Sequence, residues 1–254
     1  MQTKQNQFSR TELLLGKPAL EKLNNSTVAI FGLGGVGSFS FEALIRGGIS
    51  HLILVDDDTV CLTNINRQIH ANHDTIGSPK VDVIKERALK INPDCIIETY
   101  KTFVKEDNIN EIIPDNVDYV IDAIDTVSSK IALVVWCKKH DINIISCMGT
   151  GNKLDPTKFK IADIYSTKIC PLAKVMRHEL RKRGVQNLKV LYSEEIPLTP
   201  KCDVITCKEG CVCSGGSKKC LAKRQIPGSI SFVPPVAGMI IGGEVIKDIL
   251  KIHK

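Results

Sequence analysis

The sequence lacks an apolar segment that could cross a membrane. A membrane-spanning helix needs about 20 mostly apolar residues, but the most apolar stretch of the 254-residue chain, Ile230–Leu250, is interrupted by two prolines and three charged residues. Residues 1–10 are polar, so we expect no secretory signal. These absences argue against an integral membrane protein and favour a cytoplasmic one, in which Ile230–Leu250 forms a buried or interface helix.

The sequence also lacks a CxxC pair, the spacing typical of structural zinc knuckles, although it has ten cysteines. Five are scattered, which is typical of small buried side chains in a reducing compartment; these are Cys61, Cys95, Cys137, Cys147 and Cys170. The other five have spacings x4, x3, x1 and x6; they are Cys202, Cys207, Cys211, Cys213 and Cys220. Three interpretations of this cluster stay open: a zinc or iron–sulfur site, a redox-sensitive or disordered loop, or a catalytic thiol.

The net charge of +6 is modest, so the position of the basic residues says more than their number. Six of them crowd into ten residues of an expected helix: Lys174, Arg177, His178, Arg181, Lys182 and Arg183. One interpretation is a solvated helix face. The other is a surface that contacts the phosphate backbone of RNA, in which case charge reversal at Arg177 and Arg181 should weaken binding and flatten its salt dependence.

Short apolar runs alternate with helical patterns over the first 151 residues. This alternation predicts a Rossmann-like, doubly wound and mostly parallel sheet with helices on both faces. The expected strands are Thr27–Phe31, Leu52–Val55, Ile96–Tyr100, Tyr119–Ile124 and Ile142–Cys147. The expected helices between and before them are pieces of Arg10–Leu23, then Ser38–Arg46, Val81–Ile91, Asn108–Ile113 and Ser128–His140.

The pattern becomes irregular after residue 151. A strand-like stretch and the basic helix are followed by an expected strand at Leu188–Tyr192, the cysteine-rich loop 202–224 and a final helix. We therefore expect one domain over 1–254, with a nucleotide-binding portion at 1–151. The portion at 152–254 is expected to complete the sheet and to carry the substrate and dimer contacts.

A glycine-rich turn follows the first expected strand and opens a helix. Its glycines, which permit a tight turn and close approach of a phosphate to backbone N–H groups, are Gly32, Gly34, Gly35 and Gly37. Asp56 ends the next strand, 19 residues after Gly37, where an acidic side chain can bind ribose hydroxyls. This pair of features predicts a nucleotide site, but an NAD-dependent oxidoreductase would show the same pair.

The residues after Asp56 separate the two classes. Arg67 and Lys80 lie where a hydride-transfer site needs no cations. An adenylation site does need them, because a carboxylate attacks the α-phosphorus as one anion on another. Asp125 ends another expected strand, where it can hold Mg²⁺ against a triphosphate. Ligands bind outside the carboxyl ends of such strands, so these side chains are expected to converge.

Four motifs together resemble the E1-like family of ThiF, MoeB and HesA: GxGGxGS at the turn, DxDxVxxxNxNRQ from Asp56, GxxK at Gly77–Lys80 and DAIDT from Asp122. The resemblance implies that Asp56 binds ribose, with Asp58 beside it, and that Asp125 binds magnesium or the reacting phosphate. It implies that the phosphates of ATP are surrounded by Asn64, Arg67, Gln68 and Lys80. It also implies a homodimer in which Arg10 reaches the site of the partner subunit.

Within that family the chain is most similar to the branch of tRNA threonylcarbamoyladenosine dehydratases (TcdA, also called CsdL). The similarity lies in Asn66–Ala71, Asp155–Thr157 and Pro171–Arg177 and in the closing helix within Pro234–Leu250. It implies ATP-dependent cyclisation of the modified adenosine at position 37 of tRNA, and a sulfurtransferase-type protein as a partner. Two alternatives stay open: adenylation of a ubiquitin-like sulfur carrier, as by ThiF and MoeB, and an NAD-dependent oxidoreductase.

Overall fold

The computed structural model describes residues 5–201 and 227–252, which fold around one seven-stranded sheet. The strand order is β3-β2-β1-β4-β5-β7-β6. Every neighbouring pair is parallel except β6 and β7, which run antiparallel at one edge. The strands are β1 (Thr27–Phe31), β2 (His51–Val55), β3 (Ile96–Tyr100), β4 (Tyr119–Asp122), β5 (Ile144–Cys147), β6 (Phe159–Asp163) and β7 (Lys189–Ser193).

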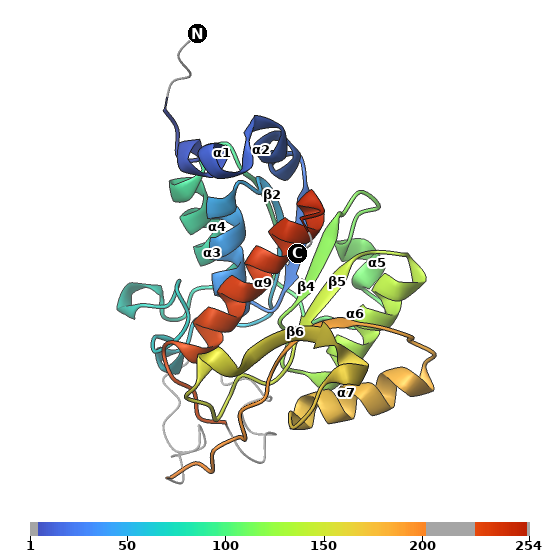
Figure 1. The fold of residues 1–254 in the computed structure, drawn as a ribbon. Coiled ribbons are helices and arrows are strands. Elements are labelled where there is room, and N and C mark those ends of the chain that lie inside the picture. Colours follow the sequence, from blue (N-terminus) through green and yellow to red (C-terminus); the bar gives the residue numbers. More distant parts are fainter. Residues whose placement is uncertain (1–4, 202–226, 253–254) are drawn as a thin grey trace.

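Helices cover both faces of this sheet (Figure 1). Those on one face share a hydrophobic cluster with the even residues of β1, Val28 and Ile30, and those on the other share a cluster with Ala29 and Phe31. The first face carries α3 (Gly37–Gly47), α4 (Lys80–Ile91) and α9 (Val233–Leu250). The second carries α5 (Ile109–Ile112), α6 (Val127–Lys139) and α7 (Pro171–Lys182). Because successive side chains of a strand point to opposite faces, the continuous apolar run of β1 fits a strand buried on both sides.

The predicted α/β, doubly wound architecture is confirmed. The strands expected at Thr27–Phe31 and Ile96–Tyr100 have those bounds in the structure. The strand expected to reach Ile124 ends at Asp122 instead, because the Asp122 carboxylate accepts the N–H of Ile124 at 3.1 Å and turns the chain. The irregular C-terminal portion adds β6 and β7 to the same sheet, as expected, whereas the division at residue 151 stays a prediction.

Helix α9 is buried against α3, which explains the apolar C-terminal stretch. A Cβ atom on Gly238 would lie 2.3 Å from the carbonyl oxygen of Val36, and one on Gly242 would lie 2.6 Å from the Cβ atom of Ala43. Glycine at both positions therefore lets the two helix backbones approach closely. Of the helices in residues 5–201 and 227–252, none has the length and apolar character needed to cross a membrane.

The scattered cysteines are mostly buried, as expected. Cys95, Cys137, Cys147 and Cys170 are buried, and burial raises the pKa of Cys137 and of Cys147 to about 12. Cys61 departs from the expectation because it is only half-buried, at the start of a surface turn (Leu62–Asn64). The cysteine cluster of Cys202, Cys207, Cys211, Cys213 and Cys220 lies outside the described residues, so its three interpretations stay predictions.

Candidate active site

The glycine-rich turn joins the end of β1 to the start of α3 through a crowded backbone. Gly32 has φ of 88°, and a Cβ atom there would lie 2.6 Å from the carbonyl oxygen of Ala123, beyond the end of β4. A Cβ atom on Gly37 would lie 1.8 Å from the carbonyl oxygen of Gly32. Only glycine fits these two positions, so the turn is folded tightly and presents the amino end of α3 at the carboxyl edge of the sheet, where helix N–H groups can bind phosphate.

Asp56 ties this turn to the end of β2. One of its carboxylate oxygens accepts the N–H of Leu33 at 2.6 Å, and the other accepts the N–H of Asp58 at 2.8 Å. The Asp56 side chain is 8% exposed. It is therefore held at the mouth of the turn, where the predicted contact with ribose hydroxyls requires a carboxylate.

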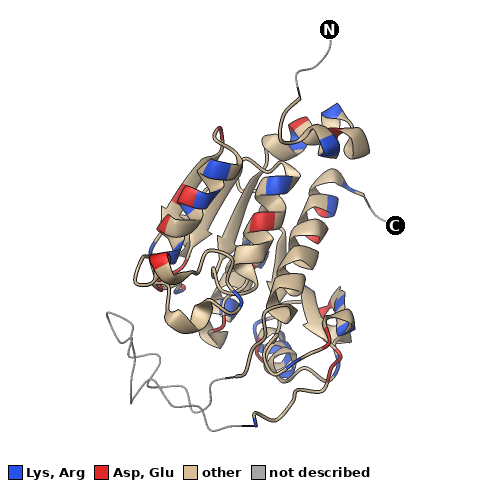
Figure 2. Cartoon of the chain, turned by 90° about the vertical axis from the view of Figure 1, so that its left-hand side faces the viewer, with Lys and Arg blue, Asp and Glu red and all other residues tan. Residues whose placement is uncertain are grey.

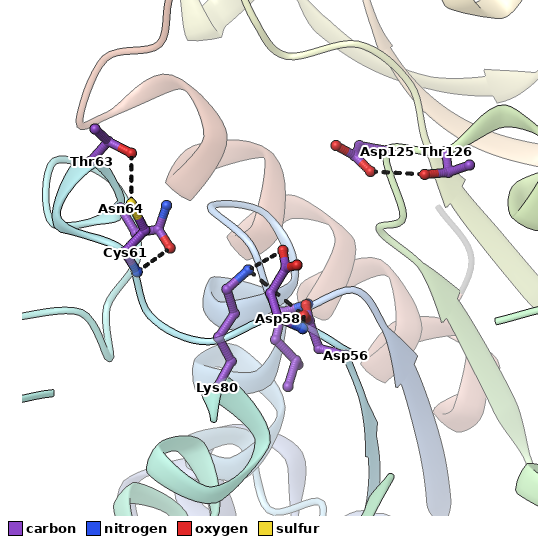
Figure 3. A network of polar contacts seen from close by, with 9 residues as sticks. Asp56, Asp58, Cys61, Thr63, Asn64, Lys80, Asp125 and Thr126 are labelled. Atoms are coloured by element: carbon purple, nitrogen blue, oxygen red, sulfur yellow. Dashed lines mark hydrogen bonds and ion pairs between the residues drawn. The ribbon is translucent and has the colours of Figure 1, made fainter. Parts of the chain in front are cut away.

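Lys80 is the first residue of α4, and its side chain is buried beside these carboxylates (Figure 3). Its Nζ atom lies 3.0 Å from Asp58 and 3.7 Å from Asp56. Burial lowers the pKa of Lys80, but the negative charges of Asp56 and Asp58 outweigh burial and hold the pKa above its ordinary value. A permanently protonated amine is thus fixed at the turn before any ligand binds.

Arg67 lies against the glycine turn at Gly35. Its Cγ and Cδ atoms would be 3.1 and 3.3 Å from a Cβ atom on Gly35, so its aliphatic stem packs directly on the turn. Its Nη1 atom donates to the carbonyl oxygen of Thr63 at 3.0 Å. Burial lowers the pKa of Arg67, but a guanidinium starts so far above neutral pH that it keeps its charge.

Two further predicted phosphate ligands lie in the same loop. The side-chain oxygen of Asn64 accepts the N–H of Cys61 at 3.1 Å, which closes the short turn that precedes Arg67. Gln68 is buried with its amide nitrogen near Gly34, and its Oε1 atom has no partner among the described groups. The structure thus places Arg67 and Gln68 on the glycine turn, Lys80 beside it through Asp56, and Asn64 in the short turn that precedes Arg67. Their roles toward ATP stay predictions.

Asp125 lies beyond the end of β4, on the other side of the site. In Figure 3 it lies beside Thr126, apart from the group formed by Asp56, Asp58 and Lys80. The side chain is exposed, accepts the hydroxyl of Thr126 at 3.3 Å, and is near enough to Lys80 to help raise its pKa. An exposed carboxylate in this place has the hard oxygen ligands that Mg²⁺ prefers.

A second group of carboxylates meets the distance requirement of a metal site. The carboxylates of Asp56, Asp57 and Asp58 each offer an oxygen within 4.8 Å of the others. Lys80 already pairs with two of these three carboxylates. The amine therefore supplies the positive charge there, and Asp125 fits a divalent cation better.

Arg10 is not brought into the site of its own chain. It is exposed on α1 (Ser9–Leu15), which is followed by α2 (Lys17–Asn24) at the amino edge of the sheet. Gln7, just before α1, donates to Asn92 at 3.2 Å, and Asn92 precedes β3. The glycine turn lies at the opposite edge, so any role of Arg10 in catalysis requires a partner subunit.

Sequence reasoning missed a buried ion pair next to Asp125. Lys130 and Asp122 are both fully buried, with 2.9 Å between Nζ and the carboxylate. Lys130 also donates to the carbonyl oxygen of Cys147 at 2.9 Å, and the Ser146 hydroxyl donates to Asp122 at 2.5 Å. The pair clamps the carboxyl ends of β4 and β5 together. The sequence did contain an indication of this burial. Lys130, Val134 and Cys137 follow the spacing i, i+4, i+7, which places the lysine on the same face of α6 as two apolar residues.

His70 was also missed. It is buried, and neither ring nitrogen has a hydrogen-bond partner among the described groups. Burial, with the positive charges of Lys80 and Arg87, lowers the pKa of His70 to about 3. The imidazole is therefore neutral near pH 7, and it is close enough to Lys80 and Arg87 for their charges to oppose its protonation.

The basic residues of α7 differ in how free they are. Lys182 and Arg183 pair with Glu179 at 3.1 and 2.7 Å. Arg177 donates to the carbonyl oxygen of Thr167 at 3.0 Å and to its hydroxyl, and Arg181 lies 5.2 Å above the ring of Tyr165. Lys174 is exposed. Figure 2 shows acidic and basic residues mixed along several helices. On α7 the contacts with Thr167 and Glu179 leave only part of the basic residues available to an anionic partner.

A family comparison agrees with this arrangement of turn, cations and carboxylates. The sequence profile of the ThiF family matches residues 8–254. The chain belongs to the ThiF family. Among individual members of this family, the chain is 48% identical over 247 residues to a tRNA threonylcarbamoyladenosine dehydratase of Bacillus subtilis, covering 96% of this chain and 95% of that protein.

A second relative of the ThiF-family chain is the tRNA threonylcarbamoyladenosine dehydratase of Escherichia coli. It is 33% identical over 251 residues, covering 96% of this chain and 93% of the relative. A crystal structure of that protein in complex with ATP matches the fold with a TM-score of 0.83 and 31% sequence identity, over 96% of this chain and 94% of the other. The family resemblance expected from the four motifs is thus confirmed.

Proposed function

We propose that this chain uses ATP to dehydrate the threonylcarbamoyl group on the adenosine at position 37 of tRNA. The carboxylate of the modification attacks the α-phosphorus of ATP, an O–P bond forms, and pyrophosphate leaves. The carbamoyl group of the same modification then attacks the acyl carbon, its proton is lost, and AMP leaves with the former carboxylate oxygen. The nucleotide is cyclised with net loss of water. Two relatives that align over nearly their whole length are named for this reaction.

The observation that carries the proposal is the buried amine of Lys80 together with Arg67 at the glycine turn. Both reacting groups are anionic in the first step, so cations fixed on the phosphate oxygens lower the barrier. They need no reorganisation during the reaction, because Asp56, Asp58 and the turn hold them in place. The second step is intramolecular, so proximity supplies much of its rate without a protein nucleophile.

The remaining groups at the turn have binding roles in this proposal. Asp56 binds the ribose, with Asp58 positioning Lys80 beside it. Asn64 and Gln68 donate amide N–H groups to the phosphates, as do the backbone N–H groups of the glycine turn. Asp125 holds Mg²⁺, which neutralises charge on the triphosphate when it is bound.

Neither alternative from the sequence is favoured by an observation on this structure. An oxidoreductase gives no reason to bury an amine beside Asp56 and Asp58. A sulfur-carrier adenylating enzyme would use the same site, but the named relatives that align over 93–95% of their own length are tRNA dehydratases. The interpretation as a tRNA-modifying enzyme is therefore supported over both.

Several further features belong to this proposal. The exposed Arg10 and the exposed Leu13 and Leu14 of α1 suit a homodimer in which Arg10 reaches the partner's site. Lys174 and Arg181 on α7 contact the tRNA backbone. Because tRNA is modified in the cytoplasm, the protein is proposed to act there. A sulfurtransferase-type protein is proposed as its protein partner.

The experiment that tests the proposal is ATP–pyrophosphate exchange with three carboxylate donors side by side. The donors are tRNA carrying threonylcarbamoyladenosine, the same tRNA without the modification, and a ubiquitin-like sulfur carrier ending in Gly-Gly. We expect exchange only with the modified tRNA, with the cyclic nucleoside appearing by mass spectrometry. Exchange with the carrier protein alone would replace the proposal by the sulfur-carrier alternative.

A further inference from the structure

Arg67 is held at its charged end by a second asparagine of the loop, Asn66. The Nη1 atom of Arg67 donates to the Asn66 side-chain oxygen at 2.8 Å, in addition to its bond with Thr63. With the stem packed on Gly35, the guanidinium is fixed from two directions. The bond engages Nη1, so the rest of the planar fork can face the phosphates.

Asn66 is itself bonded to a segment far away in sequence. Its side-chain nitrogen donates to the carbonyl oxygen of Ser229 at 3.1 Å. Ser229 precedes α9, and Pro234 of this helix lies against the glycine turn. A Cβ atom on Gly35 would be 2.9 Å from the Cβ atom of Pro234. The segment 228–234 therefore runs along the loop that carries Arg67.

This segment is anchored at its other end by Asn152. The N–H of Gly228 donates to the Asn152 side-chain oxygen at 2.6 Å, and the N–H of Asn152 donates to the Gly228 carbonyl at 2.8 Å. The Asn152 carbonyl accepts the N–H of Leu198 at 2.8 Å. Asn152 has φ of 57°, a left-handed conformation that asparagine adopts more readily than most residues. One residue thus joins three segments beyond the carboxyl end of β5, with its side chain making one of the bonds and its backbone the other two.

We propose that Asn66 is a positioning residue for Arg67, and that Asn152 positions Asn66 through Gly228 and Ser229. Neither asparagine touches the reacting atoms in this account. The polar chain Asn152–Gly228–Ser229–Asn66–Arg67 sets the angle at which the guanidinium meets the triphosphate. This inference rests on the proposed function, because it gives Arg67 its role on the phosphates.

The consequence falls on the rate more than on ATP binding. A guanidinium that swings by about 1 Å can still pair with a ground-state phosphate, but it loses its fit to the charge that develops during attack. Such a loss lowers kcat and leaves KM nearly unchanged. A purely structural role would instead lower the melting temperature without this split.

The test uses four variants of the full-length protein in pyrophosphate exchange with modified tRNA. Asn66→Ala removes both bonds of the amide, whereas Asn66→Asp keeps the oxygen that accepts from Arg67. Asn152→Gly keeps the left-handed backbone and removes only the side-chain acceptor. Asn187→Ala is the matched control, because Asn187 is an exposed asparagine that accepts from Lys138 before β7, away from the site.

We expect Asn66→Ala to lower kcat about tenfold with KM for ATP changed less than about threefold. Asn66→Asp should recover only part of this loss, because it keeps the acceptor for Arg67 but has no N–H to donate to the carbonyl oxygen of Ser229. Asn152→Gly should lower kcat about threefold, and the double variant Asn66→Ala, Asn152→Gly should be no slower than Asn66→Ala alone, since both act through one chain of bonds. The control should match the wild type.

An unchanged kcat in Asn66→Ala overturns the inference, and so does a double variant whose losses multiply. If the wild type shows no exchange with modified tRNA, the proposed function has failed. The variants are then compared with the donor that does support exchange, and the same outcomes decide the positioning role of the two asparagines.

Discussion

Two groups of basic side chains in this protein are held in opposite ways. At the carboxyl edge of the sheet, Lys80 and Lys130 are buried, and the Nζ atom of each lies within hydrogen-bond distance of a carboxylate, at 3.0 and 2.9 Å. On α7, Lys174 and Arg181 are exposed. Lys80 is proposed to meet the phosphates of ATP, and the side chains of α7 the phosphates of tRNA, whereas Lys130 holds the ends of β4 and β5 together.

The difference shows what each group can contribute. A buried charge has a large desolvation cost and persists only when a partner and hydrogen bonds fix it, so its position is set before the ligand arrives. An exposed charge loses conformational freedom on pairing and is screened by salt. The buried cations can therefore supply geometry for chemistry, whereas those on α7 can supply only affinity that adds up over several contacts.

The largest effect should follow from breaking the buried pair of α6. Replacing Lys130 by Met leaves Asp122 charged in the core, and we expect a loss of about 3–5 kcal/mol in the free energy of unfolding, measured by urea denaturation. Lys139→Met on the exposed part of the same helix should change it by less than about 0.5 kcal/mol. Adding Asp122→Asn to Lys130→Met should recover part of the loss. If both substitutions lowered the free energy of unfolding equally, burial of Lys130 would not be the cause of its effect.

The next effect concerns the rate. Lys80→Met should lower pyrophosphate exchange with modified tRNA about 10²- to 10³-fold, because one fixed donor to the developing charge is lost. Lys85→Met, an exposed lysine five residues later on α4, should leave exchange unchanged. A loss below about threefold for Lys80→Met would remove this lysine from the proposed chemistry.

A smaller effect is the pH dependence of stability that His70 causes. In the folded protein the pKa of His70 is about 3, whereas in the unfolded chain it returns to the ordinary histidine value of about 6.5. As pH falls through this window, the unfolded state takes up a proton that the folded state refuses, so stability falls by up to about 1.4 kcal/mol per pH unit.

Replacing His70 by Gln tests this window. Between pH 7 and pH 5 the wild type should lose about 2 kcal/mol more than His70→Gln, as measured by chemical denaturation at each pH. His140→Gln, at an exposed histidine after α6, should behave like the wild type. Parallel pH curves for the wild type and His70→Gln would mean that His70 keeps its ordinary pKa.

The smallest effect per residue should come from α7. Charge reversal at Lys174 and Arg181 should weaken tRNA binding severalfold and reduce the slope of log affinity against log salt by about one per contact. Reversal at Lys182 and Arg183 should have less effect, because Glu179 already neutralises part of their charge. Filter binding over a salt series measures both. Arg177 is unsuited to this test, because it bonds to Thr167. An unchanged affinity and salt slope after both reversals would make α7 a solvated helix face.

Much of the fold was predictable because its causes are local. The apolar run of Thr27–Phe31, the glycines after it and the helical spacing that follows are each visible within about 15 residues. The sequence indicated β4 correctly but extended it to Ile124, since nothing local shows that the Asp122 carboxylate turns back on the chain. Whether a side chain accepts a hydrogen bond from the backbone N–H two residues later depends on the backbone geometry at the end of the strand.

The candidate site was predictable as a set of residues but not as a set of contacts. Topology alone placed Asp56 and Asp125 at one edge of a parallel sheet, because such strands end on the same side. The position of Lys80 in the motif did not show whether its amine would pair with a carboxylate or be exposed to solvent. The burial of Lys130 was less visible still, because lysine side chains are rarely fully buried.

By itself, the sequence determined the alternation of strands and helices, the glycine turn and the edge at which polar residues gather, since periodicity and chain direction fix these. Only the tertiary structure decided which charges are buried and paired, and that Asn66 joins Arg67 to Ser229. Such contacts bring together residues up to 163 positions apart, and whether these meet depends on how whole elements pack.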